Sequence, residues 1–188
     1  MSRADTPERL LSAAIRLGVA RGVSAMSLQG IASAAGVSKA LVLYHFGDKA
    51  AVLTAVADGL GARGGERLHT AAAAPDALKA WYALAREELR LGELALLAGL
   101  AQEPDLGARA GMAIPAARGA REVAATRLAA SIYGAVGLEP RVPLSFLGRM
   151  LVRHLDGLAV AAAHAEFGAA ELEAELDTFA IALLGFGR

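Results

Sequence analysis

The chain has 188 residues, of which 55% are hydrophobic, 5% are aromatic and none is cysteine, and its formal net charge is zero. This length accommodates one sizeable core or two small ones, and the absence of cysteine excludes disulfides and thiolate chemistry. No apolar run reaches the roughly 18–20 residues of a membrane span, and the N-terminus does not resemble a signal peptide, so we expect a soluble cytoplasmic protein without a membrane partner.

Alanine supplies much of the hydrophobic content, and β-branched residues never gather in alternating runs. Because alanine is the best helix former, we predict an all-α protein. Residues 1–50 hold six basic and three acidic side chains, so the remainder of the neutral chain is acidic. A mildly basic N-terminal segment indicates a polyanionic partner there, although chance scatter of charges on solvated surfaces is the alternative.

The first fifty residues are punctuated as three short helices and the start of a fourth. Thr6, followed by proline and glutamate, marks the start of the first helix, and Gly22 marks its end. Ser27 and Ser38 are placed to cap the next two helices, and Gly36 separates them. The predicted helices cover residues 6–22, 28–35 and 38–46, and a connecting helix covers 48–64.

Small residues dominate the segment from Gly61 to Pro75, which predicts a helix end followed by a hinge or linker. Longer helical patterns follow. They cover residues 76–102, 115–134, 143–166 and 169–186.

Two short helices joined by a glycine-containing turn form the helix-turn-helix layout, in which the second helix enters the major groove of DNA. Ala32 is small where the two helices approach each other, and Gly36 supplies the positive φ that a tight turn needs. If Val42 faces the core, a helical period of 3.6 residues turns Ala40 and Tyr44 away from it.

The outward face of the helix over 38–46 is unusually apolar for a solvated surface. Contact with DNA explains it, because thymine methyl groups accept apolar side chains while Lys39 donates to guanine or phosphate. Tyr44, His45 and Lys49 carry donors suited to phosphate. The alternative is that these leucines pack against another helix. The candidate DNA-binding residues are Ser27, Gln29, Ser38, Lys39, Ala40, Leu41, Leu43, Tyr44, His45 and Lys49.

The ordered set Ser27-Leu28, Ile31-Ala32, Ala35-Gly36-Val37-Ser38-Lys39, Tyr44-His45-Phe46, Asp48-Lys49 and Leu53 resembles the DNA-binding domain of tetracycline-repressor-like (TetR) regulators. The resemblance covers residues 6–60. It implies a homodimeric transcriptional repressor that binds a palindromic operator in double-stranded DNA. Leu43 departs from the family pattern, which usually has a phosphate-binding tyrosine there, and this puts the bases read in question.

The resemblance also implies that the remaining helices bind a small-molecule effector and dimerise through the last two of them. We therefore expect a helix-turn-helix domain over 1–50 and a ligand-binding and dimerisation domain over 51–188. The last two helices hold more apolar residues than one small core requires, which favours a dimer interface. Burial within one subunit is the alternative. The candidate interface residues are Leu151, Leu155, Leu158, Leu172, Leu176 and Phe179.

Polar or aromatic residues within apolar helices are candidates for an effector pocket, since buried polar groups need partners. These candidates are Trp81, Tyr82, Arg149, Arg153 and His154. A structural ion pair, such as Arg153 with Asp156, is the alternative. The many alanines, leucines and glycines favour a largely apolar effector. His154 and His164 do not have the spacing of metal ligands on one helix face, so we expect no metal and no cofactor.

An enzyme is a rival interpretation, because Arg153, His154 and Asp156 could form an acid–base site. The sequence has no cysteine nucleophile, G-x-S-x-G elbow, P-loop or dinucleotide fingerprint, so we predict that the chain is not an enzyme. Two further alternatives remain open: a helical small-molecule-binding protein, and an activator in place of a repressor.

Overall fold

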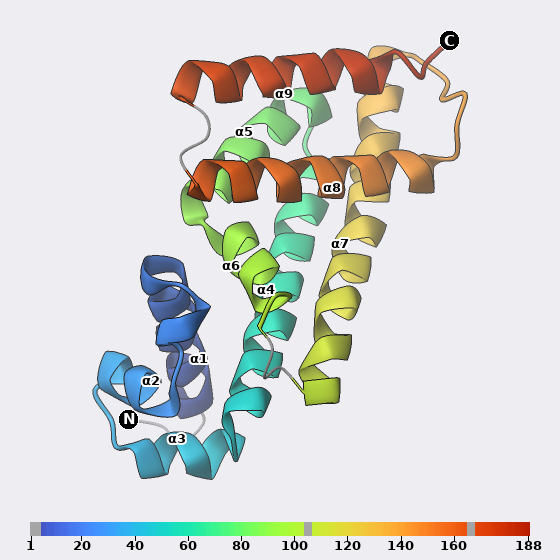
Figure 1. Cartoon of the computed structure of the whole chain (residues 1–188). Coiled ribbons are helices and arrows are strands. Elements are labelled where there is room, and N and C mark those ends of the chain that lie inside the picture. Colours follow the sequence, from blue (N-terminus) through green and yellow to red (C-terminus); the bar gives the residue numbers. More distant parts are fainter. Residues whose placement is uncertain (1–4, 104–106, 165–167) are drawn as a thin grey trace. The chain divides into compact units, whose positions relative to one another are not determined.

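The computed structural model describes residues 5–103, 107–164 and 168–188, and within these ranges the chain forms nine α-helices and one short 3-10 helix (Figure 1). The elements are α1 (Asp5–Arg21), η1 (Val23–Ala25), α2 (Leu28–Ala35), α3 (Lys39–Phe46), α4 (Lys49–Ala72), α5 (Ala77–Leu91), α6 (Glu93–Leu100), α7 (Gly107–Val136), α8 (Leu144–Ala163) and α9 (Ala169–Leu184). The all-α class predicted from composition is confirmed.

The longer helices differ from their predicted bounds at two places. The single helix expected over 76–102 is divided at Gly92, which adopts the left-handed conformation with φ of 68° and caps α5. The helix expected over 115–134 begins earlier, at Gly107, and takes Pro115 into its interior. The predicted end of the helix over 143–166 lies partly outside the described residues.

The predicted linker between Gly61 and Pro75 is instead helical as far as Ala72, because α4 continues through its glycines. Gly64 explains why a glycine is useful inside this helix. A Cβ atom at Gly64 would lie 3.0 Å from Nε of Arg121 on α7, which is closer than most such contacts. The glycine therefore allows the Arg121 side chain to pack against α4, and it does not mark a helix end.

The chain divides into two compact units, each with its own core. The head unit comprises Met1–Leu60 and Ala95–Ala117, and the body unit comprises Gly61–Leu94 and Arg118–Arg188. The head unit thus takes in more than the predicted domain over 1–50. The bounds of the functional domains themselves stay a prediction.

The core of the head unit combines residues from α1 to α4 with residues from α6 and α7. Leu96, Leu97 and Leu100 of α6 and Ile114 of α7 are buried in the same cluster as Leu10 of α1. A three-helix domain buries little apolar surface by itself, so the two later segments enlarge its core. This explains why the compact unit includes residues that are distant in sequence.

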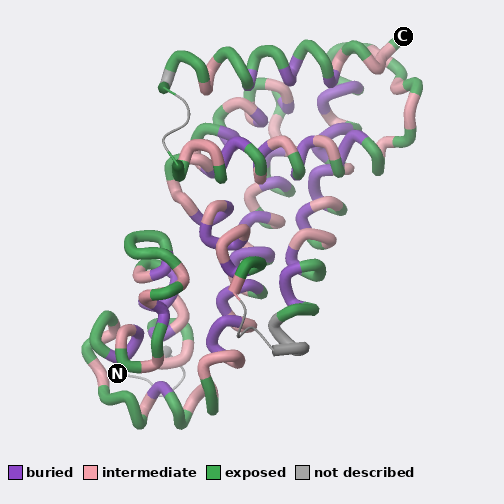
Figure 2. The backbone as a smooth tube through the Cα atoms, viewed as in Figure 1, coloured by how far each residue is buried: buried purple, intermediate pink, exposed green. Residues whose placement is uncertain are grey.

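The core of the body unit is built from α4, α5, α7, α8 and α9. Trp81, Leu128, Leu155 and Leu176 are all buried in it. Figure 2 shows buried residues recurring along α4 and α7, whereas α9 is exposed over much of its length. The helices α8 and α9 run antiparallel and contact each other (Figure 1).

No single helix among the described residues is both long and apolar enough to cross a membrane. The pair α3 and α4 meets the length and composition criteria together, but the two helices are bent by 69° relative to each other.

Candidate DNA-binding site

Side-chain caps hold the N-terminal ends of α2 and α3 where the sequence predicts them. Oγ of Ser27 accepts a hydrogen bond from the Gly30 amide at 3.0 Å, and Oγ of Ser38 accepts one from the Leu41 amide at 3.2 Å. Each cap contributes about 1 kcal/mol to helix stability. Gly36 lies between the helices with φ of 68°, in the left-handed region that favours glycine.

Apolar packing holds α3 against α2. Ile31 and Ala32 of α2 and Val42 of α3 are fully buried in the core of the head unit. Gly30 is also constrained, since a Cβ atom there would lie 2.5 Å from the carbonyl oxygen of Ala25. Val42 is the one fully buried residue of α3, and Phe46 packs partly against the same core, so the opposite side of the helix is left exposed.

The exposed face of α3 is the one that helical geometry predicts. Lys39 and Ala40 are exposed, Leu43 is 39% exposed and Tyr44 is 71% exposed. The candidates Leu41 and His45 are half-buried at the sides of this face. An exposed leucine beside an exposed tyrosine on this helix fits contact with base edges and backbone.

The remaining candidates around α3 differ in the interactions that their side chains already make within the protein. The hydroxyl oxygens of Ser27 and Ser38 accept cap hydrogen bonds, which leaves their hydroxyl hydrogens to donate to a phosphate. Gln29 is exposed on α2. Tyr44 and His45 pack edge to face, with ring centroids 5.1 Å apart. Lys49 forms an ion pair in which Nζ lies 2.8 Å from Oε1 of Glu103.

The body unit brings together three of the five effector-pocket candidates. Trp81 is fully buried, and its ring lies 5.0 Å from that of Tyr82 and 5.7 Å from that of Phe179. His154 stacks on Phe179 with ring centroids 3.9 Å apart. Burial lowers the pKa of His154 below its ordinary value of 6.5, and the negative charge of Glu175 opposes this shift. Nε1 of Trp81 and Nε2 of His154 are buried, and no residue in the described part of the chain forms a hydrogen bond with either.

The other two pocket candidates are not part of this aromatic cluster. Arg149 and Arg153 are exposed on α8, so they do not share the interior of the body unit with Trp81. The alternative pair of Arg153 with Asp156 is not formed either. Asp156 is paired with Arg121 and Arg118 of α7 instead.

Sequence reasoning missed a set of buried charges in the body unit. Arg121 is only 1% exposed, and its Nη1 lies 2.6 Å from Oδ1 of Asp156. Glu88 is also 1% exposed and accepts a hydrogen bond from Nε of Arg67 at 2.7 Å. Burial lowers the pKa of Arg67, but hydrogen bonds and charge from Glu88 and Glu93 outweigh it and raise the pKa.

A signal for one of these buried charges was present in the sequence. Glu88 continues the apolar stripe of Ala77, Trp81, Leu84 and Ala85 on α5, and a charge at a stripe position indicates burial with a partner. The identity of the partner depends on a helix that is distant in sequence. Among the described residues, no group of three metal-ligating side chains lies together.

Most of the predicted dimer-interface residues lie in the interior of their own chain. Leu151, Leu155 and Leu176 are fully buried, and Leu158 and Phe179 are at most 9% exposed, in the core of their own chain. Leu172 is half-buried against the same core. Burial within one subunit accounts for five of these six residues, and the position of a dimer interface stays a prediction.

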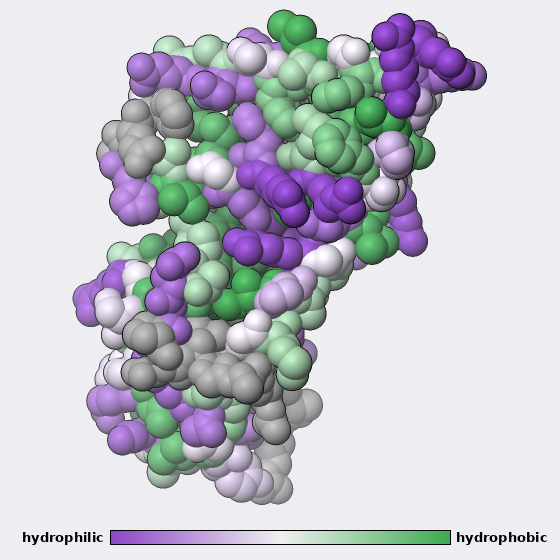
Figure 3. Space-filling view, turned by 45° about the vertical axis from the view of Figure 1, so that its right-hand side comes forward, coloured by the Kyte–Doolittle hydropathy of each residue, from purple (hydrophilic) through white to green (hydrophobic). Residues whose placement is uncertain are grey.

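A different face of α8 and α9 remains exposed and partly apolar. On α8, Phe146 and Val160 are 39% and 37% exposed, and Ile181 on α9 is 74% exposed. Phe146 and Val160 share one helix face with Arg149 and Arg153. The successive spacings along this face are three, four and seven residues, which correspond to whole turns of a helix. The space-filling view of the chain shows hydrophobic side chains beside hydrophilic ones on the surface (Figure 3).

Comparison with known proteins supports the reading of the N-terminal helices. Residues 10–56, which contain all of α2 and α3, match the family model of bacterial regulatory proteins of the tetR family. No similar relative is found among curated protein sequences.

Several solved structures share the fold over nearly the whole chain. The reduced form of NemR from Escherichia coli superposes with a TM-score of 0.77 at 18% identity, covering 98% of each chain. A TetR-family transcriptional regulator from Pectobacterium atrosepticum gives a TM-score of 0.67 at 24% identity, covering 100% of this chain and 98% of the other. The fatty acid degradation regulator FadR from Bacillus halodurans gives 0.72 at 17% identity, covering 97% and 100%.

Proposed function

We propose that this chain, a DNA-binding transcriptional regulator of the TetR family, acts as a homodimeric repressor that a small, largely apolar effector releases from a palindromic operator. Regulators of this family are non-enzymatic transcription factors, in agreement with the prediction that the chain is not an enzyme. The observation that carries the proposal is the exposed apolar face of α3 on a rigidly capped helix-turn-helix.

Operator reading is proposed to come from the exposed face of α3. Lys39 lies in the first turn, where a side chain reaches guanine or phosphate, and Leu43 is exposed where a thymine methyl group would meet it. Tyr44 can donate a hydrogen bond to a backbone phosphate through its hydroxyl group, and His45 can do so through a ring N–H. Leu43 therefore takes an apolar role in reading bases, while Tyr44 supplies a hydroxyl one residue further along.

Dimerisation is proposed to use the exposed face of α8 and α9. A dimer that places two copies of α3 in successive major grooves holds them roughly 34–36 Å apart, so the operator is palindromic. Phe146, Val160 and Ile181 supply apolar surface that folding of one chain leaves uncovered. Arg149 and Arg153 lie on the same face of α8, and arginine is enriched in such interfaces.

The effector is proposed to bind the body unit. A groove of about 380 Å³ between α4 and α5 is lined mainly by small side chains, among them Ala71, Ala74, Ala80 and Ala83, with Arg67 at its edge. This lining suits an apolar molecule with a polar end. The unpartnered ring nitrogens of Trp81 and His154 offer further hydrogen-bonding sites within the same unit.

The operator is released if the effector binds preferentially to a dimer in which the spacing of the two α3 helices does not match that of successive major grooves. The effector then lowers DNA affinity by its differential affinity for the two states, and by linkage DNA lowers effector affinity by the same factor. The boundary between the two compact units falls within α4, between Leu60 and Gly61. Glycines just beyond this point weaken the helix relative to alanine, so it is a suitable place for a change in angle.

An operator gel shift titrated with candidate ligands tests the proposal. The chain should retard its operator, and an amphipathic ligand that changes Trp81 fluorescence should release the DNA. A ligand that binds tightly but leaves operator affinity unchanged contradicts the coupling for that ligand. Transcription from the operator-bearing promoter, measured with and without the chain, separates repression from activation.

A further inference from the structure

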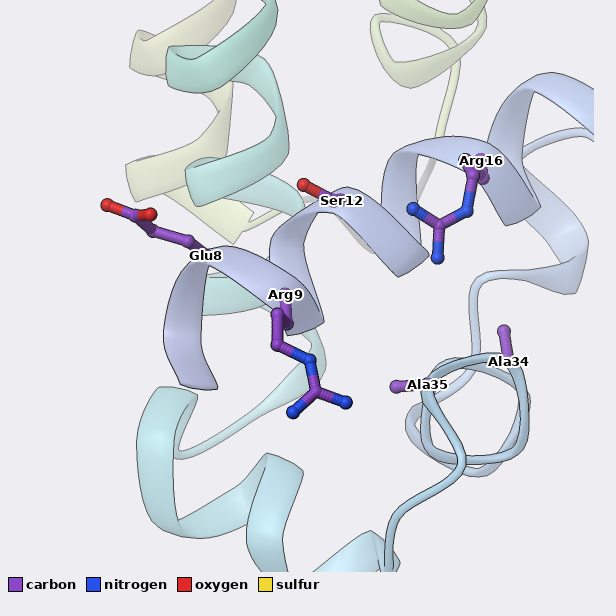
Figure 4. A pocket seen from close by; sticks show the side chains of 6 residues that line it. All are labelled: Glu8, Arg9, Ser12, Arg16, Ala34 and Ala35. Atoms are coloured by element: carbon purple, nitrogen blue, oxygen red, sulfur yellow. The ribbon is translucent and has the colours of Figure 1, made fainter. Parts of the chain in front are cut away.

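A groove of about 430 Å³ on the head unit lies outside the helix-turn-helix face described above. It is formed by α1 and the C-terminal end of α2. The residues that line it are Glu8, Arg9, Ser12, Arg16, Ala34 and Ala35 (Figure 4). The two arginines line one side of the groove. The other side is lined by alanines, whose small side chains leave room for a ligand.

The two arginines act from one face of α1. They are seven residues apart, which is two helical turns and about 10 Å along the axis. Both are exposed, and Figure 4 shows their guanidinium groups turned toward the side of Ala34 and Ala35, whereas the Glu8 carboxylate points away. Neither guanidinium forms an ion pair with a side chain in the part of the molecule whose side chains are described.

The electrostatics of the groove favour an anion. The end of α2 contributes at most about half a negative charge, and this is reduced because the amides of Gly36 and Val37 donate to the carbonyls of Ser33 and Ala32. Glu8, Arg9 and Arg16 together give the groove one net positive charge, and the Glu8 carboxylate points away from the two guanidinium groups (Figure 4), so the positive charge outweighs the helix end. The first fifty residues also carry a surplus of three positive charges.

The position of the groove identifies the anion. Ala34 and Ala35 directly precede the Gly36 turn, and Ser38 after that turn caps the recognition helix α3. The groove therefore lies beside the turn that leads into α3. A DNA strand carries one phosphate per about 3.4 Å of axis, so two arginines whose backbone positions are about 10 Å apart along α1 can each find a phosphate of their own.

We propose that Arg9 and Arg16 form a second phosphate-binding site, which grips the DNA backbone beside the segment read by α3. Guanidinium groups suit this role because they donate two parallel hydrogen bonds to phosphate oxygens. The contacts carry no base information and fix the register of α3 on the duplex. This inference rests on DNA binding through α3.

The salt dependence of DNA binding tests the site. Each phosphate contact contributes about 0.9 to the slope of log Kobs against log salt concentration. Arg9→Ala and Arg16→Ala should each reduce the magnitude of the slope by about 0.9, with operator and unrelated duplex weakened equally. Arg21→Ala is the matched control, because Arg21 is an exposed arginine of α1 that does not line the groove. Its slope should stay at the wild-type value.

Phosphate ethylation interference locates the contacts. Some ethylated phosphates should weaken binding of the wild-type protein and have no effect on the Arg9→Ala/Arg16→Ala variant. If both single variants keep the wild-type salt slope and still bind the operator, the phosphate-binding site is overturned while the proposed function stands. A wild-type chain that shows no salt-dependent DNA binding would overturn it together with the proposed reading by α3. Circular dichroism of the variants should match the wild type, since both substitutions replace exposed residues on a helix with alanine.

Discussion

Lys49 and Glu103 form an ion pair within the head unit, with Nζ and Oε1 2.8 Å apart, although they are more than fifty residues apart in sequence. Lys49 is the first residue of α4 and a candidate phosphate ligand. The Lys49 side chain is 35% exposed and that of Glu103 is 15% exposed. If Lys49 binds phosphate as proposed, the carboxylate competes with DNA for this ammonium group.

Removal of that competition should strengthen DNA binding. Glu103→Gln should raise affinity for operator and unrelated DNA by up to about 5-fold, because an exposed pair contributes about 0.2–1 kcal/mol. Lys49→Ala should weaken binding to all sequences and reduce the salt slope. Fluorescence anisotropy with labelled duplexes measures both effects. Weaker binding by Glu103→Gln would show that the pair positions Lys49 for DNA instead of competing for it.

Base reading by α3 should depend on Lys39. Lys39→Ala should weaken operator binding by about 1–3 kcal/mol and relax the preference at one position per half-site, if the contact to guanine is bidentate. Lys79→Ala, at an exposed lysine of the body unit, is the matched control. Binding to a library of operator variants measures the preference. An unchanged preference would remove Lys39 from the base-reading residues.

The helix-turn-helix could be predicted in detail because its determinants are local. Ser27, Gly36 and Ser38 act on amides within a few residues of themselves, and the single apolar anchor at Val42 sets which side of α3 is exposed. Short-range capping and helical period suffice for such features.

The body unit could not be predicted to the same depth because its determinants are tertiary. Gly64 was taken for a helix break, yet it allows close packing of Arg121, whose position is set by a helix more than fifty residues away. Leu155 was assigned to a dimer interface because a stripe of leucines has the same pattern whether its partner is in the same chain or another. Sequence period identifies the buried face of a helix but not what covers it.

Dimerisation should depend on the exposed face of α8 and α9 and not on the buried stripe. Light scattering should give about twice the chain mass of 19.2 kDa. Ile181→Glu, at a side chain that is 74% exposed, should give a folded monomer. Leu158→Glu places a carboxylate in the core of the chain itself and should give unfolded or insoluble protein. A wild-type monomer at micromolar concentration would contradict the proposed dimer.

The buried pair of Arg121 and Asp156 should matter more for stability than any exposed pair. Asp156→Asn leaves the Arg121 guanidinium buried with its main partner weakened, so the free energy of unfolding should fall by up to about 3–5 kcal/mol. Glu173→Gln removes an exposed pair with Arg86, which solvent screens, and should lower the free energy of unfolding far less. Urea unfolding measures both. Equal losses in the two variants would show that burial does not distinguish these pairs.

The stability of the body unit should depend on pH through His154. Burial lowers the pKa of His154 in the folded state, with Glu175 opposing, so the unfolded chain binds a proton more readily than the folded one. The stability that depends on neutral His154 is therefore fully present above about pH 6.5 and is lost as the pH falls below it, by at most about 1.4 kcal/mol per pH unit.

His154→Gln should flatten the change in unfolding free energy between pH 7.5 and 5.5. His164→Gln, at an exposed histidine, should retain the wild-type pH dependence. Because the ring stacks on Phe179, His154→Gln also lowers stability at every pH, and only the difference in slope reports the titration. A wild-type slope in the His154 variant would assign the pH dependence to other groups.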